Sequence, residues 1–220
     1  MKLREVHLLA SDVDAALRFY RDTLKLDARI TDGDVHVIVG GVSQLVFHRA
    51  PEGWHGVHHF AFNVPEAQFA GAKAWLMQRM LLHRDATGVD EFFFADWNAH
   101  AAYFFDPLGN IVEIIARHTL PDDDVRPFSS AGLRCISEIG LPVEDVRRAV
   151  PRLCDEASTN AYRGPGSDEF AAVGDEHGLL IVVRCGRLWF PDTGIAAQAV
   201  PLRILIELPD GSMRDVALGQ

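Results

Sequence analysis

The stretch HLLASDVDAAL at residues 7–17 recurs later in the chain as HFAFNVPEAQF at residues 59–69. In both copies, an apolar run that begins with a histidine leads to a short polar residue, Ser11 or Asn63. An acidic residue follows three positions later, which is the spacing of a helix capping box. The repeated pattern therefore predicts a strand that runs directly into a helix, present twice in the chain.

Each predicted helix is followed by β-rich residues that turn signals interrupt. These signals are Asp32–Gly33 in the first copy and Asp106–Pro107–Leu108–Gly109 in the second. The repeating unit is therefore predicted to contain a strand, a helix and three strands. The two units span about residues 1–50 and 56–117.

The rest of the chain predicts a linker and a third, degenerate unit. Residues 118–131 combine prolines, a run of aspartates and serines, which is typical of a linker. Residues 132–220 again predict a strand, a helix and further strands. The first strand of this unit, ISEIG, has no histidine, and Val182 stands where Glu113 would align, so we expect no metal ligands there. The predicted fold class is α+β, with tandem βαβββ units and a third degenerate βαβββ-like unit.

The composition argues against several classes of function. A net charge of -10 argues against nucleic acid or an anionic membrane as the main partner. The sequence shows no membrane span and no signal peptide, so the expected location is the cytoplasm. Three widely spaced cysteines predict reduced thiols. A single third unit leaves a sheet edge free, so we expect it to pair in a homodimer or to pack on the first two units.

Glu113 lies between Val112 and Ile114 in an otherwise apolar strand. An ionised carboxylate in such a setting is costly unless it is paired with an arginine or bound to a metal ion. If the first two units pair with pseudo-twofold symmetry, His7 and His59 occupy equivalent positions and can converge on Glu113. Two histidines and one carboxylate form a facial triad suited to Fe²⁺, and tolerable for Mn²⁺ or Zn²⁺.

Three motifs, VHLLASDVDAALRFYRDTL, HHFAFNV and YFFDPLGNIVE, resemble those of the vicinal oxygen chelate superfamily. This superfamily includes glyoxalases, bleomycin-resistance proteins and extradiol dioxygenases, and the resemblance covers residues 3–117. It implies paired βαβββ units that form a curled mixed sheet around one divalent metal ion, held by His7, His59 and Glu113. It also implies a small substrate that chelates the metal through adjacent oxygens.

The resemblance further implies which residues surround the metal. It places Tyr103 on the inner face, as a hydrogen-bond donor to the substrate or a catalytic acid/base. Ala101 and Phe94 are expected to line the substrate pocket, since aromatic residues cluster in this part of the chain. His48 is expected either to contact the substrate or to act as a fourth ligand.

Two classes of function remain open from the sequence. The first is a metal-dependent enzyme of the dioxygenase or glyoxalase type. The second is a metal-free protein that sequesters a small aromatic compound, as the resemblance to bleomycin-resistance proteins implies.

Overall fold

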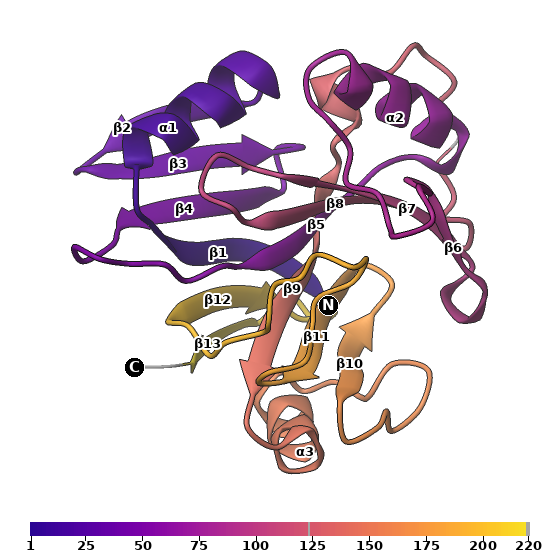
Figure 1. Ribbon diagram of the computed structural model, residues 1–220. Helices are drawn as coiled ribbons and strands as arrows, with labels where there is room; N and C mark the ends of the chain where they lie inside the picture. The colour runs from indigo at the N-terminus through magenta and orange to yellow at the C-terminus, as the bar shows by residue number, and fades with distance from the viewer. Residues whose placement is uncertain (123, 219–220) are drawn as a thin grey trace.

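The strands of the protein form two mixed sheets, as shown by a computed structural model that describes residues 1–122 and 124–218 (Figure 1). The first sheet has six strands in the order β13-β12-β1-β4-β3-β2, and the second has seven in the order β10-β11-β9-β5-β8-β7-β6. One large hydrophobic core includes residues of both sheets. None of the described helices is long and apolar enough to cross a membrane.

The first two units contain the predicted succession of a strand, a helix and three strands. The first unit comprises β1 (Lys2–Ala10), α1 (Val13–Arg18) with a π-helical turn (Phe19–Thr23), β2 (Asp27–Thr31), β3 (Asp34–Val39) and β4 (Ser43–Arg49). The second comprises β5 (His59–Asn63), a 3₁₀ turn (Glu66–Gln68), α2 (Phe69–Met77), β6 (Phe92–Phe94), a 3₁₀ turn (Ala95–Trp97), β7 (Ala99–Phe105) and β8 (Ile111–Arg117). In each unit the first and last strands pair in parallel, as a helical crossover connection requires.

The third unit is degenerate, which confirms the predicted fold class. After a 3₁₀ turn (Ser130–Gly132), its elements are β9 (Cys135–Val143), α3 (Val146–Glu156), β10 (Phe170–Asp175) and β11 (Gly178–Arg184). A single bridge between Ala161 and Val173 stands in place of the outer strand. The chain ends in a hairpin of β12 (Leu202–Glu207) and β13 (Met213–Leu218).

The units pair in a way that differs from the predicted pairing. β5 pairs antiparallel with β9, so the second and third units share the second sheet. β1 pairs antiparallel with β12, so the hairpin completes the first sheet (Figure 1). The first strands of the two units are β1 and β5. Each pairs along one edge with the last strand of its own unit, which leaves its other edge free. The apolar strands β9 and β12 occupy those two edges, so the predicted pairing of the first two units with each other is not observed.

The start of the first helix also differs from the prediction. The side chain of Asp12, rather than Ser11, accepts a hydrogen bond from the backbone N–H of Ala15 at 2.8 Å. The second predicted cap, Asn63, is the last residue of β5, and its side-chain oxygen instead accepts a hydrogen bond from Arg117 at 3.5 Å. The repeat therefore marks the approximate starts of the helices, whereas the capping residue depends on the local backbone.

The DPLGN turn before β8 links the first and second units. The buried carboxylate of Asp106 accepts hydrogen bonds from the backbone of Leu108 and Asn110, both at 2.9 Å. It also accepts one from the Tyr20 hydroxyl, in the first unit, at 2.8 Å. The side chain of Asn110 accepts a hydrogen bond from the backbone N–H of His58 at 2.9 Å. The turn thus fixes the start of β8 relative to β5 and anchors the first unit against both.

We expect Tyr20→Phe to lower the free energy of unfolding by about 1–3 kcal/mol, because it removes a buried donor from Asp106. Urea denaturation of the variant measures this loss. Tyr162→Phe is a control, since the Tyr162 hydroxyl lies half-buried, 3.3 Å from Glu176. Equal effects of the two substitutions would contradict the anchoring role of Tyr20.

His58 is buried directly before β5, and neither of its ring nitrogens has a hydrogen-bond partner among the described residues. Burial lowers the pKa of His58 from 6.5 to about 4. Between these two pH values the unfolded ring binds a proton that the folded ring does not, so stability falls as the pH falls.

We therefore expect His58→Phe to remove part of the acid sensitivity, up to about 3 kcal/mol between pH 6.5 and 4. Chemical denaturation at several pH values checks this, with the exposed His55→Phe as a control. A stability difference between wild type and His58→Phe that stays constant over this pH range would contradict it.

Candidate metal centre

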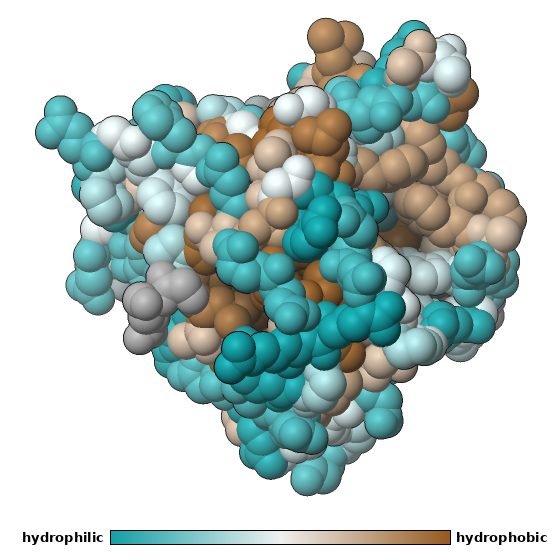
Figure 2. Space-filling view, turned by 60° about the horizontal axis from the view of Figure 1, so that its bottom comes forward, coloured by the Kyte–Doolittle hydropathy of each residue, from teal (hydrophilic) through white to brown (hydrophobic). Residues whose placement is uncertain are grey.

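A cavity of about 400 Å³ lies on the face of the second sheet that is opposite to the main core. Strands of the second and third units form its floor, and the segment between β11 and β12 forms one wall. Figure 2 shows a hollow bordered by hydrophobic surface on the right of the molecule. The walls of the cavity carry many aromatic side chains, namely Phe94, Trp97, Tyr103, Phe170, Trp189 and Phe190.

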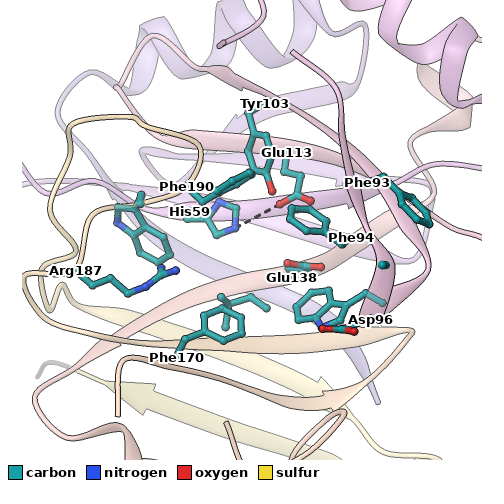
Figure 3. A pocket seen from close by; sticks show the side chains of 14 residues that line it. His59, Phe93, Phe94, Asp96, Tyr103, Glu113, Glu138, Phe170, Arg187 and Phe190 are labelled. Carbon is teal, nitrogen blue, oxygen red and sulfur yellow. Dashed lines mark ion pairs between the residues drawn. The ribbon is translucent and has the colours of Figure 1, made fainter. Parts of the chain in front are cut away.

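Three buried donors, His59, Glu113 and Glu138, meet at the floor of this cavity (Figure 3). One ligand atom of each lies within 4.8 Å of the others, and His59 Nε2 is 3.6 Å from Glu113 Oε2. The strand register explains the arrangement. Ala61 of β5 pairs with Glu113 on one side and with Glu138 on the other, and His59 lies two residues earlier on the same face. Three neighbouring strands thus bring the donors together.

The hydrogen bonding of His59 prepares it to be a ligand. Its Nδ1–H donates to the carbonyl oxygen of Ile111 at 3.1 Å, which leaves Nε2 unprotonated beside Glu113. Burial lowers the pKa of His59 to about 4, so the ring is neutral at physiological pH. A bare imidazole nitrogen and a carboxylate oxygen are both electron-pair donors. Their close approach therefore fits a cation held between them.

The charges around the group are unbalanced. Arg117, fully buried beneath the cavity, donates to Glu138 and, at 3.2 Å, to the hydroxyl of Ser137. Burial and the charge of Glu138 raise the pKa of Glu113 well above its usual value. Two carboxylates thus lie near one guanidinium. The sequence left open that an arginine pairs with Glu113, but the arginine pairs with Glu138. A proton or a divalent cation is required to neutralise the remaining charge.

The predicted ligand His7 lies elsewhere, in β1 of the first sheet. It shares a hydrogen bond of 2.9 Å with His48 and lies 3.1 Å from Glu5. His48 occupies the register position in the first unit that Glu113 occupies in the second, and it contacts Asp34 at 2.7 Å. Neither histidine reaches the cavity, because β12, rather than β5, pairs with β1. This partner strand places Arg203 opposite His7, and Arg203 in turn pairs with Asp215 of β13.

The other predicted site residues have mixed outcomes. Tyr103 and Phe94 line the cavity, and Tyr103 is the register partner of Glu113 on β7. Burial, followed by the charge of Glu113, raises the pKa of Tyr103 well above its usual value. Ala101 is fully buried in the sheet and does not line the cavity, because larger side chains cover it.

Glu138 is the residue that the sequence interpretation missed. The third unit was expected to lack ligands, yet Glu138 of ISEIG occupies the position related to His59 by the pseudo-twofold pairing of β5 and β9. The acid in this apolar strand was the available signal. In the third unit, the position equivalent to Glu113 is Ile181, rather than Val182. Glu113 pairs with Ala61 of β5, and Ile181 pairs in the same way with Gly140 of β9. The third unit therefore supplies one donor, not two.

No family model and no curated protein matches this sequence. Among solved structures, a putative dioxygenase from Bacillus subtilis subsp. subtilis str. 168 is similar over 99% of this chain and 84% of its own, with 14% identity and a TM-score of 0.57. A lactoylglutathione lyase from Agrobacterium tumefaciens matches 52% of this chain and 92% of its own, with 23% identity and a TM-score of 0.42. The first likeness extends over nearly the whole chain and shows the fold. Together with the repeated units and the curled second sheet, it shows an α+β fold built from βαβββ-like units, as the sequence predicts.

Proposed function

We propose that the protein is a divalent-metal-dependent enzyme acting on a small substrate that binds the metal through two adjacent oxygens. The observation that carries this proposal is the buried group of His59, Glu113 and Glu138, in which a single arginine faces two carboxylates. A neutral imidazole and two carboxylates are donors for Mn²⁺, Fe²⁺ or Zn²⁺. The set contains one histidine fewer, and one carboxylate more, than the facial triad expected from the sequence.

The three side chains that would hold the metal line the cavity, where a substrate would bind. A bound divalent ion would supply a Lewis acid that polarises the two substrate oxygens and stabilises negative charge on them. Arg117 holds one oxygen of Glu138 and leaves the other oxygen of that carboxylate for coordination. Trp189, which is nearly fully buried beside His59, excludes water from this end of the cavity.

Tyr103 is the side chain placed to handle a proton. Its raised pKa keeps the hydroxyl protonated at neutral pH, and its backbone pairs with that of Glu113. The hydroxyl can therefore donate a hydrogen bond to a substrate oxygen bound beside Glu113, or transfer its proton to that oxygen. This role is compatible with either a glyoxalase-like or a dioxygenase-like reaction.

We expect the purified protein to bind one equivalent of Mn²⁺, Fe²⁺ or Zn²⁺ and to melt at a higher temperature when loaded. His59→Ala and Glu138→Gln should each weaken binding by about 100-fold or more, because each removes a donor. His7→Ala is the matched control and should bind normally, since His7 lies in the other sheet. Calorimetric titration measures these affinities. Lack of stoichiometric binding by wild type would support the sequestration alternative instead.

We expect Tyr103→Phe to lower turnover by about 10²- to 10⁴-fold while metal affinity stays within a few-fold of wild type. Oxygen uptake with catechols and isomerisation of methylglyoxal–thiol adducts are suitable assays for the metal-loaded protein. Tyr162→Phe, outside this cavity, is the control. Turnover by Tyr103→Phe at the wild-type rate would show that this hydroxyl only lines the wall.

A further inference from the structure

The segment at residues 185–201, between β11 and β12, forms a fixed wall over the metal centre. His83 donates a hydrogen bond from Nε2 to the carbonyl oxygen of Pro191 at 2.6 Å. The backbone N–H of Ala86 donates to the side chain of Asp192 at 3.0 Å. Both contacts tie this wall to the second unit, so its side chains have a defined position relative to the metal ligands.

Arg187 is the cation of this wall that faces the cavity (Figure 3). It is half-buried, and among the residues that the structure describes no carboxylate lies within ion-pair distance of it. Its guanidinium lies over the ring of Phe170, 5.4 Å from the centroid. Arg184, three residues earlier, is exposed and pairs with Glu169. A partly desolvated guanidinium without a counter-ion leaves strong donors free, and these fit a carboxylate in two-point geometry.

Trp189 of the same wall is buried beside His59. Its side chain is only 4% exposed, and its indole N–H has no hydrogen-bond partner among the described residues. The ring lies 5.2 Å, centroid to centroid, from that of His59. The ring therefore forms the part of the cavity wall beside His59.

The remaining walls of the cavity favour a ligand with a flat, apolar ring. This ring would lie between the metal ligands at one end and Arg187 at the other. The rings of Phe94, Phe170 and Phe190 line a cavity of about 400 Å³, a size typical of sites for small molecules. Asp96 also lines this space but is exposed at its rim, across from Arg187 (Figure 3). Solvent screens a charge at the rim more than it screens a half-buried one. The cavity therefore favours an anion at the end near Arg187.

We propose that the substrate is a planar ring compound with adjacent oxygens at one edge and a carboxylate at another, and that Arg187 binds this carboxylate. The inference rests on the proposed function, because the adjacent oxygens are held by the metal at His59, Glu113 and Glu138. Arg187 thus determines specificity through the charge of the substrate, whereas the metal recognises its oxygens.

Two probes of nearly equal shape test this inference, 3,4-dihydroxybenzoate and the neutral 3,4-dihydroxybenzamide. The protein is first titrated with Mn²⁺, and each probe is then titrated into the loaded protein. Wild type should bind the benzoate at least about 10-fold more tightly than the benzamide, as expected for a charge-assisted pair. Arg187→Gln should abolish this preference without changing Mn²⁺ affinity, and Arg187→Lys should keep part of it. Arg184→Gln, which removes a nearby exposed cation, should retain the full preference.

The two steps separate failure of this inference from failure of the proposed function. If Mn²⁺ binds but wild type prefers neither probe, or if Arg187→Gln keeps the preference, the role of Arg187 is overturned and the metal enzyme stands. If wild type binds none of Mn²⁺, Fe²⁺ and Zn²⁺, the proposed function fails and the inference fails with it.

Discussion

The candidate site depends on one constraint, which is the burial of two carboxylates beside a single guanidinium. Arg117 offsets the charge of Glu138, and Glu113 is left with its charge uncompensated in an apolar strand. Such an arrangement is costly in a folded protein unless a further positive charge enters. The neutral ring of His59 adds a third electron-pair donor at the same point. The local chemistry thus calls for a proton or a cation, and the cavity beside it supplies space for a ligand.

The two sheets show how the same unit can serve different purposes. In both, a first strand carrying a histidine pairs in parallel with the last strand of its unit. In the second sheet, the antiparallel neighbour is β9, which adds the acid Glu138. In the first sheet the neighbour is β12, which places Arg203 opposite His7. The neighbouring strand therefore adds an acid beside the histidine in the second sheet and a basic residue in the first.

The cavity is assembled from parts that are distant along the chain. The second unit contributes His59, Glu113 and Tyr103, while the third contributes Glu138 and the wall that carries Arg187 and Trp189. Candidate metal ligands, a protonated hydroxyl and a guanidinium therefore face one space from different elements. This space is bounded by a sheet and by a segment held through hydrogen bonds to its neighbours.

The sequence by itself determined the repeating unit and the α+β class, and it marked His59 and Glu113 as candidate metal ligands. These follow from local patterns, since alternation, turn residues and an acid in an apolar strand act over a few residues. The choice of partner strand was decided only by the tertiary structure. β5, β9 and β12 are all apolar strands, so their sequences do not say which of them pairs with β1. Packing between distant parts of the chain makes that choice. That choice excluded His7 and His48 from the site and brought Glu138 into it, because a strand pairing moves every side chain on the strand together.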